Sequence, residues 1–406
     1  MTTPTGDAAR TRIALLCQFA LFGIVNVSWT SRLPSLMGAL GIDAAELGRL
    51  LLIGGIGSLL GALSGGAVVT RIGARATLLV GVVGHAVGFG LLAVSVFTGS
   101  VPLFLPGALI NGVSSAWSNL SINVSAAAVE QRIGRAIMPH FHAMFSVGAA
   151  LGALIAAGFA RAGLGIGPQV VAVIAAGTAI RLLLIRPATA ITLAGDRSAT
   201  KGRAAAGEAL SAWREPRTLL LGLVLMAASL TEGTAGTWMP LAVVEGFAAH
   251  EDVGALAYGS FVAAMTLVRA FGTRLIDRFG RVVVLRVSGG SALVGLLLFV
   301  TGPTLALAWA GVILWGFGAA LGNPIATTAA ADDPLRASVR VSVVASFSTV
   351  TALAAPPLLG LLAAEVGTRQ ALLVVGVFIV LSLSLAGAAR RQVPDPAPVR
   401  TAAADV

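Results

Sequence analysis

Two short basic segments, Arg71-Ile-Gly-Ala-Arg75 and Asp277-Arg-Phe-Gly-Arg281, are related by an offset of 207 residues, and each follows a long apolar stretch. Pro34 and Pro240 repeat in the same way, at an offset of 206. Equivalent segments at equivalent places indicate a duplicated chain with two parallel halves, an arrangement found in secondary transporters. The binding site is then expected between the halves.

The composition shows that water is not the main solvent of this chain. Charged residues make up 11% of its 406 residues and apolar residues 57%, whereas ordinary soluble domains contain about 25% charged residues. The chain also contains 50 glycines, as expected where transmembrane helices pack closely. Its apolar runs of about twenty residues fit helices, since a membrane β-barrel would show alternation within about ten residues. We therefore expect an all-α membrane protein.

The apolar runs predict twelve membrane-spanning helices in two six-helix halves. We expect an N-terminal bundle over 1–186, a linker over 187–216 and a C-terminal bundle over 217–406 with a short tail. Asp43-Ala-Ala-Glu46 is a capping-box pattern that predicts the start of the second helix. The predicted spans are 13–38, 46–69, 76–97, 102–126, 138–160, 168–186, 218–243, 254–273, 282–301, 303–328, 338–363 and 370–389.

The placement of the 27 basic residues orients the chain. Only Arg32, Arg49, Arg161 and Arg369 fall in segments on one side, and most of the others fall on the opposite side. Because cytoplasmic loops carry the excess of Lys and Arg, both termini are predicted to face the cytoplasm. This placement accounts for the formal charge of +10, so we expect no nucleic-acid partner.

The repeated loop resembles the Gly-x-x-x-Asp-Arg-x-Gly-Arg motif of the major facilitator superfamily. The copy that begins at Asp277 matches, whereas Thr70 stands where the first copy would carry Asp. The resemblance implies the twelve-helix fold of that superfamily, with two pseudo-symmetric six-helix bundles, alternating access and gating at the cytoplasmic loops. The residues of these gating loops are Arg71, Gly73, Arg75, Asp277, Arg278, Gly280 and Arg281.

Three further segments resemble a poorly characterised bacterial inner-membrane subgroup of the same superfamily. They are Trp29-Thr-Ser-Arg32-Leu-Pro34, the segment from Asn119 through Glu130 to His142, and Glu232-Gly to Trp238. Asn119 and Thr237 stand where this subgroup is expected to carry Asp. The resemblance places the chain in the inner membrane of a bacterium.

Glu232 is the strongest candidate for proton coupling, because an ionisable residue within a span is costly to bury and is usually functional. A structural hydrogen bond to a neighbouring helix is the alternative. His142 is the second candidate, because imidazole titrates near physiological pH. Arg269 could pair with Glu232 or lie at the cytoplasmic interface, and we expect the interface.

Candidates for lining the substrate cavity are polar or aromatic residues within the spans. Arg32 and Trp29 can share a helix face and receive an anionic or aromatic solute, although a snorkelling arginine is equally consistent. The fourth span is the most polar, and its groups could line a cavity or join helices. The predicted cavity residues are Asn26, Trp29, Arg32, Trp117, Asn119, Asn123, Trp238 and Asn323.

These patterns predict a secondary transporter that moves a small organic solute by alternating access, coupled to protons, and works as a monomer in the lipid bilayer. An exporter of amphiphilic compounds or lipids, or a receptor built on the same scaffold, is the alternative. No phosphate-binding loop, nucleophile with a base, or cluster of metal ligands is evident, so we expect no enzyme activity, cofactor or metal. Cys17, the single cysteine, excludes an internal disulfide.

Overall fold

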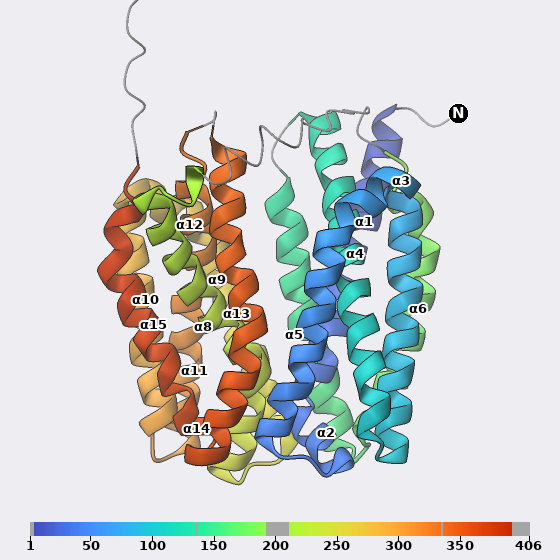
Figure 1. Cartoon of the computed structure of the whole chain (residues 1–406), viewed down its shortest axis with the longest axis vertical. Coiled ribbons are helices and arrows are strands. Elements are labelled where there is room, and N and C mark those ends of the chain that lie inside the picture. Colours follow the sequence, from blue (N-terminus) through green and yellow to red (C-terminus); the bar gives the residue numbers. More distant parts are fainter. Residues whose placement is uncertain (1–3, 135–136, 192–210, 334–335, 392–406) are drawn as a thin grey trace, which may run out of the picture.

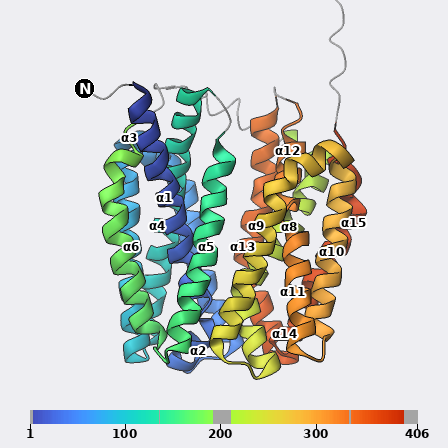
Figure 2. The same cartoon turned by 180° about the vertical axis from the view of Figure 1, so that it is seen from behind.

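The computed structural model describes residues 4–134, 137–191, 211–333 and 336–391, and within these ranges the chain is helical without strands. The all-α prediction is therefore confirmed. Two bundles lie side by side, one from α1 to α6 and the other from α8 to α15 (Figures 1 and 2). The helices of the first bundle are α1 Pro4–Thr30, α2 Leu33–Leu40, α3 Ala44–Thr98, α4 Val101–Ile133, α5 Met138–Arg161 and α6 Ile166–Ala188. Those of the second are α8 Pro216–Phe247, α9 Glu251–Phe279, α10 Arg281–Thr301, α11 Leu305–Ala319, α12 Gly322–Ala330, α13 Ala337–Val366, α14 Thr368–Ala371 and α15 Leu373–Leu385, followed by the 3-10 turn η1 Ala386–Ala389.

The predicted repeat is visible in the backbone. Gly73 interrupts α3 with φ 81° and ψ 158°, and Gly280 separates α9 from α10 with φ 78° and ψ 156°. Both angles fall in a region that L side chains rarely adopt, which explains why glycine stands at both places. The two halves thus turn from one span to the next in the same conformation, so α3 contains two of the predicted spans.

Ten described segments are long and apolar enough to cross a membrane. One of them, α3, supplies two spans, and α4 is too polar to be among the ten, in keeping with the polar fourth span. The Asp43 capping box forms as predicted: Asp43 accepts from the Glu46 backbone, and the Glu46 side chain accepts from that of Asp43. The twelve-helix fold is confirmed. The predicted boundaries of the halves stay predictions, because most of the linker lies outside the described residues.

Proline shapes three of the helices in different ways. The predicted first span divides into α1 and α2, with Pro34 in the first turn of α2, where its missing N–H costs nothing. The tenth span breaks into α11 and α12 just before Pro324. Pro356 and Pro357, in contrast, lie inside one continuous helix, α13.

The two ends of the molecule differ, and we call them the basic end and the closed end. The basic end is where α1 begins, α6 ends and α8 begins, and the closed end is where α2 and α14 lie (Figure 1). At the closed end the halves are joined by polar contacts that we call the latch, formed by Arg32, Ser35, Arg161, Glu251 and Asp252.

The latch pairs basic groups of the first half with carboxylates of the second. Arg32 Nε lies 2.8 Å from Glu251 Oε2, and the Ser35 backbone N–H donates to Glu251 Oε1 at 2.9 Å. Arg161 Nη1 lies 3.4 Å from Asp252. Among the described residues, the cross-half hydrogen bonds and ion pairs that the structure records all belong to this latch.

Close backbone packing supports the latch. A Cβ added to Gly48 of α3 would lie 2.5 Å from the carbonyl oxygen of Pro356, and one added to Gly360 would lie 2.5 Å from that of Ala44. The two helices therefore touch through glycine near the closed end, which brings the halves as close as packed helices can come.

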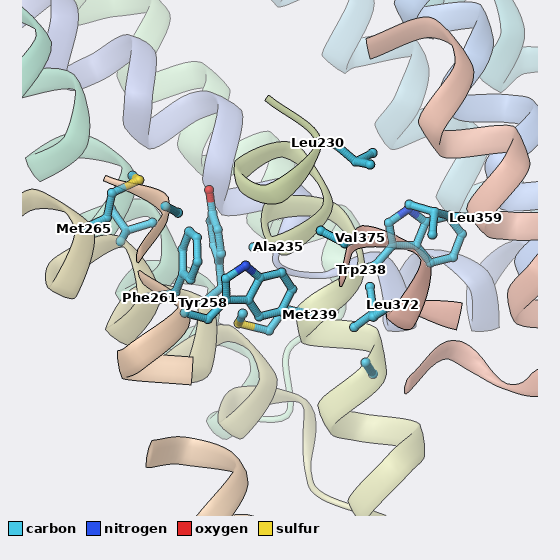
Figure 3. Packing of buried hydrophobic residues seen from close by; sticks show 14 of the residues in the cluster. Leu230, Ala235, Trp238, Met239, Tyr258, Phe261, Met265, Leu359, Leu372 and Val375 are labelled. Carbon is cyan, nitrogen blue, oxygen red and sulfur yellow. The ribbon is translucent and has the colours of Figure 1, made fainter. Parts of the chain in front are cut away.

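The apolar core of the second half is rich in aromatic side chains. Phe261 packs edge-on against Trp315, with ring centroids 5.7 Å apart. Figure 3 shows Trp238 among Leu359 and Leu372, away from Tyr258 and Phe261. Trp238 is only 2% exposed, so the structure places this predicted cavity residue in the core, where its large ring is shielded from water.

Candidate functional site

Glu232 lies near the midpoint of α8 and forms an ion pair with Arg269 of α9, at 2.8 Å between Nη2 and Oε2. The expectation that Arg269 lies at the cytoplasmic interface is therefore wrong, because the nearby carboxylate offers a partner. Both side chains remain about 30% exposed, at 30% for Arg269 and 29% for Glu232. The pair is thus held within the bundle yet is open to water on one side.

Neutral polar groups extend this pair to two more elements. Asn323 Nδ2 of α12 donates to Glu232 Oε2 at 3.0 Å, and Ser229 Oγ of α8 donates to Asn323 Oδ1 at 3.2 Å. Ser229 and Ser348 of α13 share a hydrogen bond of 2.6 Å. We call Glu232, Arg269, Asn323, Ser229 and Ser348 the Glu232 network.

The break between α11 and α12 helps to hold Arg269. A broken helix leaves backbone carbonyls without their usual partners, and Arg269 Nε donates to one of them, that of Ala320, at 3.0 Å. Asn323 sits in the first turn after the same break. The break between α11 and α12 and the charge of Glu232 thus meet at one place.

The network can exist in two arrangements. Oε2 of Glu232 accepts from both Arg269 and Asn323. A proton on the carboxyl group would remove the ionic attraction and leave Arg269 without its counter-charge. Because the groups come from four elements, a change of protonation would alter how those elements are held together.

His142, on α5 of the first half, is exposed. The predicted proton-coupling residues His142 and Glu232 therefore lie on opposite halves, on α5 and α8. Tyr258 of α9, a residue that the sequence did not single out, lies close to α8, because a Cβ added to Gly236 would be 3.0 Å from its hydroxyl oxygen.

A cavity, which we call the N-half pocket, lies between α1, α3 and α4 and has a volume of about 210 Å³. It contains Asn26 and Trp29, two of the predicted cavity residues, and no charged side chain lines it. Asn111 also lines it and keeps its Oδ1 without a hydrogen-bond partner. The full lining is Asn26, Trp29, Thr30, Leu50, Leu51, Gly54, Ser58, Leu92, Phe104, Ala108, Asn111, Gly112 and Ser115.

A polar face of α4 continues from this pocket toward the basic end. Ser115 lines the pocket, and Asn119 and Asn123 follow at intervals of four residues, so the three share one helix face. Asn119 is exposed, and Asn123 Nδ2 donates to its Oδ1 at 3.2 Å. Since exposed amides are costly against lipid, this face is expected to border water.

Two other predicted cavity residues are engaged elsewhere. Trp117 Nε1 donates to Ser64 Oγ at 3.0 Å, which joins α4 to α3. Arg32 is 2% exposed and is held in the latch, where it also donates to Gln169 Oε1 at 2.8 Å and to the Leu164 carbonyl at 2.9 Å. In this conformation Arg32 therefore neither snorkels nor faces the N-half pocket.

The predicted gating loops are unequal. Arg281 binds Asp332 at 2.7 Å, and Arg217 binds the same carboxylate at 2.8 Å, which ties α8 and α10 to the end of α12. Asp277 is exposed, and Arg278 lies over the Phe279 ring. In the first half, Arg71 and Arg75 are exposed. Gly73 and Gly280 shape both loops alike, so the difference lies in the side chains.

Comparison with known proteins bears on this arrangement. The family model described as the Major Facilitator Superfamily matches residues 14–353. The chain belongs to the major facilitator superfamily. Over 377 residues it is 32% identical to "Uncharacterized transporter y4wD" of Sinorhizobium fredii, an alignment that covers 91% of this chain and 95% of that protein.

Solved structures of the superfamily share the fold. A crystal structure of the nucleoside transporter NupG superposes with a TM-score of 0.76 at 16% identity, covering 94% of this chain and 99% of that one. The D-xylose-proton symporter superposes with a TM-score of 0.70 at 15% identity, covering 95% and 97%. This superfamily member therefore has the fold of known transporters.

Proposed function

We propose that this chain is a proton-coupled secondary transporter that moves a small organic solute across the bacterial inner membrane by alternating access. The observation that carries the proposal is the ion pair of Glu232 and Arg269, which is partly exposed near the middle of a span. Membership in a superfamily of transporters, and a structural likeness to a proton symporter, support it. The protein is proposed to act as a monomer.

We infer that the basic end faces the cytoplasm, as the excess of arginine there requires, and that both termini lie on that side. The conformation is then inward-facing. The latch closes the periplasmic end, whereas Asn119 and His142 are exposed between the latch and the basic end. Alternating access requires the latch to open and the basic ends to approach each other.

Proton binding at Glu232 is the proposed coupling step. In the unprotonated state Arg269 is neutralised by Glu232, and in the protonated state its positive charge has no counter-ion and must find another partner or more water. Solute binding that favours one arrangement shifts the population of the other. Proton and solute movements are thereby linked.

An exporter of amphiphilic compounds or lipids, and a receptor without transport, remain competing functions. The lining of the N-half pocket contains two amides and three hydroxyls, which favours a polar solute over an amphiphile. A receptor would bind a ligand without any flux, so a transport measurement distinguishes it.

The experiment uses purified protein in proteoliposomes, with a solute first identified by thermal stabilisation. Glu232→Gln is expected to abolish uptake driven by a pH gradient and to keep counterflow exchange, because the amide cannot exchange protons. Glu245→Gln, on the same helix near the closed end, is the matched control and should transport normally. Gradient-driven uptake by Glu232→Gln at the wild-type rate would overturn the proposal.

A further inference from the structure

Among the described residues, the side chains that line the N-half pocket carry hydroxyl, amide and aromatic groups but no ionic group. Arg32, which lies between α1 and α2, has its guanidinium engaged by Glu251 and Gln169. A charged solute placed in this pocket would lose its hydration without gaining a counter-ion, at a cost of several kcal/mol. The lining therefore selects against ions.

The amide oxygens in the pocket can accept hydrogen bonds from a solute. Asn26 Nδ2 is already committed to the Phe22 carbonyl at 2.8 Å, which leaves the Asn26 oxygen as the group available to a solute. Asn111 keeps its Oδ1 without a partner. Two carbonyl oxygens of this kind are best matched by O–H groups, which can also accept from Ser58 and Ser115 in the same lining.

Trp29 adds a flat apolar surface. Its ring meets Phe89 edge to face, with centroids 6.0 Å apart, and it also lines the pocket. An aromatic surface beside hydrogen-bonding groups suits a ring that has both C–H faces and a hydroxylated edge. The volume of about 210 Å³ is compatible with a single such ring.

We propose that the N-half pocket binds an uncharged, polyhydroxylated ring of monosaccharide size, held by Asn26, Asn111 and Trp29. The proposal rests on the proposed transport function, because it names the solute class for that function. On this proposal the first half recognises the solute, and the Glu232 network couples its transport to protons. The described residues that line the pocket all belong to the first half.

The test measures thermal stabilisation of the full-length protein in detergent by a panel of defined compounds. The panel contains uncharged aldoses and ketoses, the corresponding sugar acids and amino sugars, nucleosides and amphiphilic cations. At least one uncharged monosaccharide is expected to stabilise the protein at millimolar concentration. Its carboxylate and ammonium counterparts are expected to bind at least about tenfold more weakly, because each buries an unpaired charge.

Variants then locate the binding. Asn111→Leu and Asn26→Leu are each expected to weaken sugar binding at least about tenfold, whereas Asn123→Leu, on the same helix outside the pocket, should bind normally. Trp29→Leu serves as the further variant if either leucine replacement of an amide fails to fold. Glu245→Gln, whose carboxylate accepts from Thr368 outside the pocket, should bind the same sugar within about threefold of the wild type.

The outcomes separate this inference from the proposed function. Stabilisation by charged or amphiphilic compounds alone, or sugar binding unaffected in all of the folded pocket variants, would overturn the pocket assignment while leaving proton coupling open to its own test. Sugar binding that depends on Asn26 and Asn111, with no proton movement on transport, would support the pocket and overturn the coupling. Absence of stabilisation by every sugar in the panel would count against the pocket assignment.

Discussion

Arg181 of the first half and Arg269 of the second both lie within membrane-spanning helices, and their surroundings differ. Arg181 of α6 is 1% exposed, donates to Gln18 Oε1 and to His85 Nδ1, both at 3.1 Å, and lies over the Phe22 ring. Arg269 is 30% exposed and is paired with a carboxylate. Arg181 is thus buried among neutral partners, whereas Arg269 is partly exposed and lies beside an acid.

This difference bears on which of the two arginine sites is better suited to taking up a proton. In the described part of the chain no carboxylate pairs with Arg181, and its Nη2 and His85 Nε2 have no hydrogen-bond partner. Because His85 Nδ1 accepts from a cation, a second proton on that ring would place two positive charges together. The sealed cluster is therefore a poor place to take up a proton, whereas the Glu232 network is suited to it.

The largest expected effect comes from exchanging each arginine for methionine. Arg269→Met should reduce gradient-driven uptake at least about tenfold, because Glu232 loses the partner whose attraction depends on its charge. Arg181→Met should lower stability, because Gln18 and His85 lose their donor. It should keep gradient-driven uptake per folded protein within about threefold, because Arg181 contacts no carboxylate in the described part of the chain. Equal losses in both variants, measured in proteoliposomes at equal protein content, would remove the distinction between the two arginines.

A second prediction concerns the latch, to which the first half contributes the arginines and the second half the acids. Glu251→Gln leaves the buried Arg32 without its counter-charge, a change that typically costs about 3–5 kcal/mol. The population should move toward the outward-open state. Spin labels at Thr98→Cys and Thr301→Cys, in a Cys17→Ser background, should move apart at the closed end.

The control for the latch is Glu365→Gln, an exposed acid of the same half near the same end. It should leave the label distance unchanged. If Glu251→Gln also leaves the distance unchanged, the latch does not hold the closed end.

The features that could be predicted are those set by the pattern of residues along the sequence. The apolar runs and the repeated loop predict twelve spans and the equivalent loops that contain Gly73 and Gly280, because length and repetition are set along the chain. Glu232, Asn26 and Asn323 could be proposed because polar groups within spans are costly. Which of these groups meet is decided by how the helices rotate and pack, and that is not written in local sequence.

The corrections follow the same division. The aromatic ring of Trp238 is as well suited to a core as to a cavity. The charge of Arg32 is paired with Glu251, which is far away in the sequence. Arg269 was expected at the interface because its partner lies 37 residues away on another helix. Ser229 and Ser348 carry no signal of their own, since serine is common in transmembrane helices.

The shared backbone of the halves gives a third, smaller prediction. Gly73→Ala and Gly280→Ala should each lower stability by about 1–2 kcal/mol, because both positions have positive φ. Gly90→Ala and Gly290→Ala, where an added Cβ meets nothing within 4 Å and φ is not positive, should not destabilise the protein. Unfolding temperatures in one detergent compare the four, and a loss at one turn glycine without the other would contradict their equivalence.

The smallest expected effect concerns Glu215, just before α8, which accepts from Arg340 at 2.7 Å and from Thr218 at 2.8 Å and pairs with Arg336. Partial burial raises the pKa of Glu215, but the hydrogen bonds from Arg340 and Thr218 and the nearby positive charges outweigh it and lower that pKa below its usual value.

The depressed pKa fixes the sign of the effect. The contribution of Glu215 to stability should be complete above the usual glutamate pKa of about 4.3 and should be lost as the pH falls through the lower value in the folded protein. Glu215→Gln should therefore unfold at a lower temperature than the wild type at pH 7, with the gap narrowing below about pH 4. A gap that is constant down to pH 3 would show that the charge of Glu215 is not responsible.

The most direct test of the central claim is the number of protons that move with the solute. Protein in liposomes containing a pH-sensitive dye is given the stabilising solute without an imposed gradient, and the change in internal pH is recorded for the wild type and for Glu232→Gln. The account predicts a proton movement coupled to solute entry in the wild type and solute entry without proton movement in Glu232→Gln. An equal proton signal in both proteins would contradict the assignment of coupling to Glu232.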